Sequence, residues 1–320
     1  MKVFVAGATG VLGRALVPQL VARGHEVVGM TRSTFKKELL RGLGARPVVA
    51  DALDPDAVAQ AVASAAPEVI VHQLTALSGE MSARDMRHPE RSYAVTMTNR
   101  LRTEATDHLL AAGRAVGARR FVAQSFAAFR FARAGGPVQT EAEPLDPDPP
   151  PSMRAAQAGI VYLERAVTTI EWGEGVVLRY GGFYGPGTAI SLAPDAPFAA
   201  PIRNRRFPIV GDGGGIWSHI HIADAAAATV AAVEHGHTGI YNVVDDEPAP
   251  VREWLPVLAD ALHAKPPRRV PRWLGRLAAG EMATVMMTEV RGASNEKAKR
   301  ELGWRPRYPS WRLGFTQGLG

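Results

Sequence analysis

Short apolar runs recur along the chain, and each ends where glycine or polar residues begin. Seven of them have the length and composition of buried strands: VFVAG, EVVGM, ARPVVAD, EVIVHQL, RFVAQS, GVVLRYG and GIYNVVD. Stretches with apolar residues at helical spacing separate successive runs. Since strands that alternate with helices form parallel sheets with crossover connections, the pattern predicts a doubly wound α/β fold with a parallel (Rossmann) sheet of about seven strands.

The first predicted strand leads into a turn with glycines at the spacing GxxGxxG, at Gly7, Gly10 and Gly13. In such a turn the first glycine lets the chain reverse sharply. The second lets backbone N–H groups approach a pyrophosphate, and the third lets the helix pack on the strand. Leu12 and Leu16 then follow at helical spacing. The turn therefore predicts a dinucleotide site, with the pyrophosphate at the N-terminus of the following helix.

The segment 141–151 interrupts the alternation, because EAEPLDPDPPP contains five prolines and cannot form regular structure. Ser152 follows it and is expected to cap the next helix. Beyond the sixth strand the chain is irregular, and we expect a second lobe built from separate pieces. The expected division is a dinucleotide-binding Rossmann domain of residues 1–180 and 236–247, and a smaller C-terminal substrate-binding lobe of residues 181–235 and 248–320.

Composition narrows the classes of protein. Of the 320 residues, 46% are hydrophobic, enough to bury a sizeable core. Cysteine is absent, which excludes disulfides and thiolate metal sites, and the nine histidines show no metal-ligand spacing. The first strand begins at Lys2, and no uncharged apolar run reaches about 18 residues. We therefore expect neither a signal peptide nor a membrane partner, and we expect a cytoplasmic protein.

The net charge of +6 is spread along the chain, with only short clusters such as Arg203, Arg205 and Arg206. This distribution is typical of a solvated basic surface, so we expect no nucleic-acid partner. The expected partner is a small-molecule substrate, and the sequence leaves a homodimer open.

Eight motifs occur along nearly the whole chain: GATGVLG, ADALD, LLAAGRAVGARRFVAQS, LRYGGFYGPG, PIVGDGG, HIADAAAA, YNVVDDEP and NEKAKRELGWRP. Their order resembles that of the extended short-chain dehydrogenase/reductase superfamily, of the NAD-dependent epimerase/dehydratase type. The resemblance implies that the Rossmann domain binds the cofactor and that the C-terminal lobe closes over the substrate.

The end of the second strand bears on the choice of cofactor. In NAD-preferring members of the superfamily a carboxylate near position 31 binds the adenosine ribose. This chain has Thr31, Arg32 and Ser33 there. Without a carboxylate a 2′-phosphate is not repelled, and Arg32 can bind it bidentately while Ser33 donates a further hydrogen bond. We therefore expect NADP, with NAD as the alternative. A solvated Arg32 is the competing interpretation.

The resemblance implies further cofactor contacts at the adenine, beneath the cofactor and near the nicotinamide. The expected cofactor residues are Gly7, Thr9, Gly10, Val11, Leu12, Gly13, Thr31, Arg32, Ser33, Asp51, Ala52, Leu74, Thr75, Ser125, Tyr180 and Phe183.

The superfamily transfers protons with a tyrosine and a lysine four residues apart on one helix, because a free tyrosine has a pKa of about 10 that nearby positive charge must lower. The helix SMRAAQAGIVYLERAV is expected in this place, and Glu164, which matches a family glutamate, puts Ala156 and Ile160 at the two positions. No lysine lies within residues 38–264, so no register restores the pair. Tyr162 is expected to face elsewhere on the helix.

Other polar residues are weaker candidates. Ser125 ends the fifth strand and is the candidate catalytic residue, through a hydrogen bond to a substrate carbonyl, or else it caps local backbone. His219 and His221 alternate along WSHIHIAD and either meet a ligand or are packed in the interior. Asp224 is expected to be the N-cap of the next helix. Tyr184 is expected to be structural.

The stretch WLGRLAAGEMATVMM has apolar residues at helical spacing. They are Leu274, Leu277, Ala278, Met282, Val285 and Met286. The pattern favours a core helix or a lid over an apolar pocket, with a membrane-surface helix as the alternative.

Three functions stay open at this point. The first is an NADP-dependent oxidoreductase of the atypical extended short-chain type. It would transfer hydride to or from a small, apolar carbonyl, enone or imine, with the proton supplied by Ser125, water or the substrate. The second is a non-catalytic NADP(H)-binding sensor or scaffold. The third is a nucleotide-sugar epimerase or dehydratase, whose oxidation step requires the missing tyrosine–lysine pair.

Overall fold

A seven-stranded parallel sheet forms the centre of the computed structural model, which describes residues 1–77, 85, 87–127 and 131–320. The strand order is β12-β7-β5-β4-β1-β2-β3, and every neighbouring pair is parallel. The strands are β1 (Lys2–Ala6), β2 (Glu26–Thr31), β3 (Arg46–Val49), β4 (Val69–His72), β5 (Arg120–Phe126), β7 (Glu174–Tyr180) and β12 (Gly239–Val243). The predicted fold class is confirmed, and each of the seven predicted strands is present.

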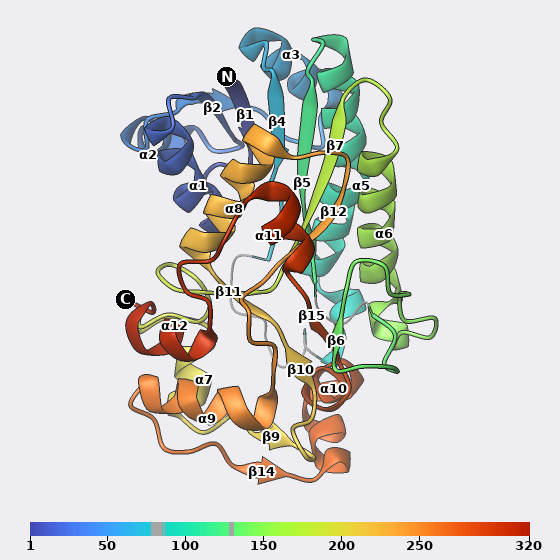
Figure 1. The fold of residues 1–320 in the computed structure, drawn as a ribbon, viewed down its shortest axis with the longest axis vertical. Coiled ribbons are helices and arrows are strands. Elements are labelled where there is room, and N and C mark those ends of the chain that lie inside the picture. Colours follow the sequence, from blue (N-terminus) through green and yellow to red (C-terminus); the bar gives the residue numbers. More distant parts are fainter. Residues whose placement is uncertain (78–84, 86, 128–130) are drawn as a thin grey trace.

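Helices cover both faces of this sheet (Figure 1). One face packs against α1 (Val11–Ala22), α2 (Lys37–Gly42) and α8 (Ile222–His235). The other packs against α3 (Pro55–Ala65), α5 (Tyr93–Ala115) and α6 (Arg154–Thr168). Side chains alternate across a strand, so Val3 and Val5 enter the first core while Phe4 and Ala6 enter the second. Both faces are thus buried, as continuous apolar strands require.

The second lobe lies at the carboxyl edge of the sheet and has its own core around Trp254, Trp311 and Phe315 (Figure 1). Its helices are α7 (Ala199–Arg203), α9 (Val251–Ala261), α10 (Arg272–Thr288) and α12 (Trp311–Gln317). Short strand pairs complete it: β8 (Gly182–Tyr184) with β11 (His219–His221), β9 (Ile209–Val210) with β14 (Arg269–Val270), β10 (Ile216–Trp217) with β13 (Ala249–Pro250), and β6 (Val138–Gln139) with β15 (Gly292–Ala293).

Two segments that the predicted division places in the lobe belong to the sheet layer instead. Helix α8 packs against α1, and its residues share a core with the strands. Helix α11 (Glu296–Leu302) packs on α8 and β12, and Leu302 enters the same core. The predicted boundary is therefore wrong for these two helices. Alternating strands and helices identify the layers, but not which helix fills the last place on a face.

Helix α10 does not present one continuous apolar face. Gly280 has φ 87°, which breaks the helix into two halves. Leu277 of the first half is exposed, whereas Val285 of the second half is buried. Arg87 Nη2 donates to the Ala278 carbonyl at the break, 2.7 Å away. The single apolar face predicted for this stretch is therefore wrong. Within the described part of the chain, no helix is long and apolar enough to cross a membrane.

Two predicted helix caps also differ. Ser152 lies in a 3-10 turn (Pro151–Met153), and α6 begins after it at Arg154. The N-cap of α8 is His221, whose Nδ1 accepts from the Ala223 N–H at 3.2 Å. The Asp224 carboxylate instead accepts two distant N–H groups, those of Arg307 and Tyr308, both at 2.9 Å. It therefore fastens the C-terminal segment to α8.

Candidate nucleotide-binding site at the carboxyl edge of the sheet

The glycine turn after β1 has the geometry that a pyrophosphate site needs. Gly7 has φ +92°, and its carbonyl accepts the Gly10 N–H at 2.9 Å. A Cβ on Gly13 would lie 2.4 Å from the Gly7 carbonyl oxygen, so this position packs too tightly for any side chain. A Cβ on Gly10 would meet only that same oxygen, at 3.2 Å, and otherwise open space. The turn thus leaves Gly10 facing the place where a ligand would approach.

The N-terminus of α1 opens directly onto this space. The N–H groups of Val11, Leu12 and Gly13 in its first turn have no carbonyl partner within the helix. They form the positive end of the helix dipole and favour a phosphate. The Leu12 side chain is buried in the core, so this residue can contribute only its backbone. Thr9 is half-buried at the rim of the turn.

The end of β2 carries one uncommitted cation. Arg32 is exposed, and the described residues offer it no ion pair or hydrogen bond. Ser33 is half-buried, and its N–H donates to Thr31 Oγ1 at 3.2 Å. The Thr31 side chain is itself buried. Arg32 is therefore open to solvent and Ser33 partly so, while the Thr31 hydroxyl accepts from the backbone of the turn.

Neighbouring strand ends line the same edge. The Ala50 N–H donates to the Thr31 carbonyl at 3.0 Å, which places the exposed Asp51 beside the end of β2. Ala52 is buried. After β4, Leu74 and Thr75 are half-buried next to the glycine turn. The structure brings these residues to one edge, and their contacts with a cofactor stay predictions.

Tyr180 does not reach this edge with its hydroxyl. The residue is 1% exposed, and its Oη lies 2.7 Å from Thr229 Oγ1 of α8. Burial raises the pKa of Tyr180 well above its ordinary value. The side chain of Tyr180 therefore belongs to the core, and its place near the nicotinamide stays a prediction. Phe183 is half-buried on β8, with its ring centroid 5.4 Å from that of Tyr180.

Ser125 takes part in a buried charged cluster. Its Oγ donates to Glu164 Oε1 at 2.6 Å. Arg179 Nε and Nη2 donate to the two oxygens of Glu164, both at 2.9 Å. Arg179 and Glu164 are 4% and 5% exposed. The hydroxyl proton of Ser125 is thus directed at a buried carboxylate between the sheet and α6, and its catalytic role stays a prediction.

Helix α6 presents Ala156, Ile160 and Glu164 along one stripe, since residues four apart share a helix face. Glu164 contacts the ends of β5 and β7, so Ile160, one turn closer to the helix start, covers the carboxyl edge of the sheet. Ile160 is buried and Ala156 half-buried. Tyr162 is 41% exposed and donates to Asp107, with oxygen–oxygen distances of 2.6 and 2.8 Å. Between the start of α6 and Glu164, the residues of this stripe, Ala156 and Ile160, therefore carry no ionisable group.

The two strand histidines belong to the lobe core. Both His219 and His221 contact the Tyr184 ring, with centroid distances of 6.5 and 5.3 Å. His221 Nε2 lies 2.9 Å from the Gly318 carbonyl oxygen. Neither ring nitrogen of His219 has a partner among the described residues, and burial lowers its pKa to about 3. The packed interpretation holds for both.

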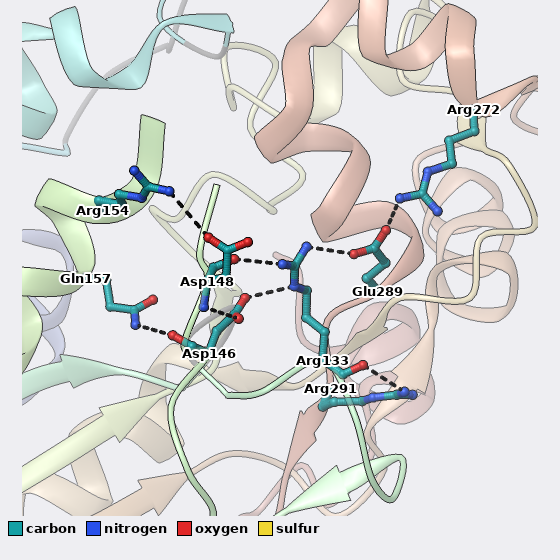
Figure 2. A network of polar contacts seen from close by, with 8 residues as sticks. All are labelled: Arg133, Asp146, Asp148, Arg154, Gln157, Arg272, Glu289 and Arg291. Atoms are coloured by element: carbon teal, nitrogen blue, oxygen red, sulfur yellow. Dashed lines mark hydrogen bonds and ion pairs between the residues drawn. The ribbon is translucent and has the colours of Figure 1, made fainter. Parts of the chain in front are cut away.

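The ion-pair network around Arg133 was not predicted from the sequence. Arg133 follows β5 and bridges to the lobe through its Nε to Asp146 (2.8 Å), its Nη1 to Glu289 (2.9 Å) and its Nη2 to the Asp148 carbonyl (2.8 Å) (Figure 2). It ties the proline-rich loop to the end of α10. Arg179 was missed as well, although an arginine inside the apolar run VVLRY signals a buried partner.

Comparison with known proteins identifies the family of this chain. The model of the NAD dependent epimerase/dehydratase family matches residues 3–243. The chain belongs to this family. The resemblance found in the motifs is thereby confirmed, together with the Rossmann fold.

Relatives of the epimerase/dehydratase family include reductases. The chain is 47% identical over 316 residues to a 3-diazoavenalumate denitrifying reductase from a Streptomyces species, covering 98% of this chain and 99% of that protein. It is 30% identical over 274 residues to the 2-alkyl-3-oxoalkanoate reductase of Stenotrophomonas maltophilia, covering 82% of this chain and 76% of that protein. The expectation of an enzyme is confirmed.

Solved structures share the whole fold. A human epimerase family protein with NADPH has a TM-score of 0.75 at 20% identity, covering 100% of this chain and 99% of that chain. A Thermus thermophilus UDP-glucose 4-epimerase with NAD has a TM-score of 0.71 at 25% identity, covering 100% and 98%. Members of the family thus bind a nicotinamide nucleotide, and the glycine turn of this chain fits one.

Proposed function

We propose that this protein is an NADPH-dependent reductase that replaces the diazo group of a small aromatic substrate by hydrogen. The observation that carries the proposal is the identity of 47% across 98% of the chain with the 3-diazoavenalumate denitrifying reductase. The absence of a tyrosine–lysine pair on α6 supports it independently, because this reaction does not need one. The proposed location is the cytoplasm.

The chemistry fits a site without an acid. When bound, NADPH supplies a hydride. Replacing the diazonium group of an arene by hydrogen consumes that hydride and releases N₂, with no net proton uptake. Ketone reduction, in contrast, needs a proton for the developing alkoxide. Ile160 and Ala156 line the stripe above Glu164 without an ionisable group, and the Ser125 hydroxyl is held by Glu164. Neither Ala156 nor Ile160 can deliver a proton.

The cofactor would be held by residues that the structure leaves available. The first-turn N–H groups of α1 and the open side of Gly10 suit the pyrophosphate. Arg32 and Ser33 suit the 2′-phosphate, since the Arg32 guanidinium would break no contact with a described residue by binding it.

A second candidate is reduction of a small carbonyl, enone or imine, as the sequence analysis first expected. It is favoured by the identity of 30% with the 2-alkyl-3-oxoalkanoate reductase. The proton would then have to come from water or the substrate.

Steady-state NADPH oxidation distinguishes the two candidates. We expect an aryl diazonium salt to be reduced, with one N₂ released per NADPH and the arene as product. We also expect the rate to vary little between about pH 6 and 8, because no protein acid ionises in the reaction. The control is the matching aryl ketone, which should react slowly. Ketone reduction with no reaction of the diazonium salt would favour the second candidate, and inertness toward both would contradict the proposal.

Cofactor selectivity gives a separate prediction. Arg32→Ala should weaken NADPH binding by about ten- to a hundredfold and leave NADH unchanged, because only the 2′-phosphate contact is lost. Calorimetric titration of both nucleotides measures this. Arg46→Ala, an exposed arginine on the next strand, is the matched control. Equal affinities of the unaltered protein for the two nucleotides would contradict NADP preference.

A further inference from the structure

The network around Arg133 carries more positive than negative charge. Figure 2 shows four guanidinium groups, those of Arg133, Arg154, Arg272 and Arg291, with three carboxylates. Asp146, Asp148 and Glu289 provide the carboxylates, and each of the first three arginines pairs with at least one of them.

Arg291 is the arginine left over. It has no ion pair with any residue that the structure describes, and its Nη2 reaches only the Arg133 carbonyl oxygen, at 3.4 Å. Its Nε is buried and has no hydrogen-bond partner there either. A partly buried guanidinium normally finds an acceptor for each N–H group, because leaving one unmade costs desolvation energy. The Nε of Arg291 therefore lacks an acceptor among the described residues.

The position of Arg291 puts it beside the carboxyl edge of the sheet. It directly precedes β15, whose Gly292 N–H donates to the Pro137 carbonyl at 3.0 Å. The next residue, Ala293, packs with Ala127 after β5 and with Val244 after β12. Arg291 thus stands where two central strands end, on the side of the lobe that faces them.

We propose that Arg291 binds the carboxylate of the substrate. The inference rests on the proposed function and adds that the substrate is an organic acid. A guanidinium offers a carboxylate two parallel N–H groups along its Nε–Nη edge, and the unpartnered buried Nε of Arg291 is one of them. The two reductases described above, at 47% and 30% identity, are named for carboxylate substrates, an avenalumate and an oxoalkanoate. A carboxylate would also bring the network to charge balance.

Binding of two unreactive probes tests this without turnover. In the presence of NADP⁺, 4-hydroxycinnamate should bind more tightly than its neutral amide, 4-hydroxycinnamamide. Arg291→Met should weaken the acid by about ten- to a hundredfold and the amide by much less, because only the charged contact is lost. Arg291→Lys should recover part of the affinity. The matched control is Arg154→Met, which removes another arginine of the network whose partner Asp148 is exposed.

Three other results of the binding measurements would overturn the inference. Equal weakening of acid and amide in Arg291→Met would show that Arg291 only fastens the Arg133 loop. Equal affinity of the unaltered protein for the two probes, or an effect as large in Arg154→Met, would show that the carboxylate is not read at Arg291. If the unaltered protein does not reduce the diazonium salt in the steady-state assay, this would contradict the proposed function alone, because the binding preference is measured without reaction.

Discussion

Gly10→Val is expected to abolish binding of NADPH and NADH while the protein stays folded. Gly10 has φ −72° and ψ 175°, extended backbone that any residue adopts. A Cβ at this position would lie 3.2 Å from the Gly7 carbonyl oxygen and otherwise in open space, so a branched side chain fits with a small shift of the turn, but a pyrophosphate cannot then approach the N–H groups of α1. We expect a loss of more than about a hundredfold in affinity, measured by calorimetry, with only a small drop in the thermal unfolding midpoint.

Two other glycines serve as controls for this substitution. Gly13→Val should instead destabilise the fold, since even its Cβ would lie 2.4 Å from the Gly7 carbonyl oxygen. Gly42→Ala, at an exposed position of α2 with no atom near its Cβ, should leave binding unchanged and raise stability slightly, because alanine favours a helix over glycine. Nucleotide binding that survives Gly10→Val at full strength would show that the turn is not the site.

The sheet and the glycine turn were predictable because their signals are local. A run such as VFVAG followed by GATGVLG contains its own strand, turn and helix start, and β1 and α1 lie where these residues predict. The break in α10 was not predictable in this way. In the sequence Gly280 resembles a tolerated helix glycine, and its positive φ becomes apparent only when Arg87, far away along the chain, packs against it.

The same difference between local signals and distant contacts applies to the candidate site. Arg32 was predictable, since the residue at a strand end needs only an exposed position to serve the cofactor. The partner of Ser125 was not predictable, because Glu164 lies 39 residues away on α6. The orientation of the Tyr180 side chain was not predictable either, since the strand pattern does not say which face of the sheet a residue at the strand end takes. Thr229 holds its hydroxyl within the core.

Removing the Glu164 carboxylate is expected to destabilise the protein strongly. Glu164→Ala leaves the Arg179 guanidinium buried without a counter-charge between the sheet and α6. Breaking a buried ion pair from one side typically costs about 3–5 kcal/mol in the free energy of unfolding. Urea denaturation measures the loss directly. The cost arises from desolvation of the remaining charge, so it should persist at high salt, where surface ion pairs are screened.

Companion variants separate the charge from the packing. Glu164→Leu combined with Arg179→Met removes both charges and should recover most of the stability, because well-packed apolar residues replace a buried pair at little cost. Ser125→Ala should cost about 1.5–3 kcal/mol, the value of one hydrogen bond to a charged group, and should leave turnover per folded molecule unchanged. A double variant no more stable than Glu164→Ala would show that packing volume, and not an uncompensated charge, dominates this cluster. A large loss of turnover in folded Ser125→Ala would return the hydroxyl to the chemistry, and with it the carbonyl reduction that needs a proton.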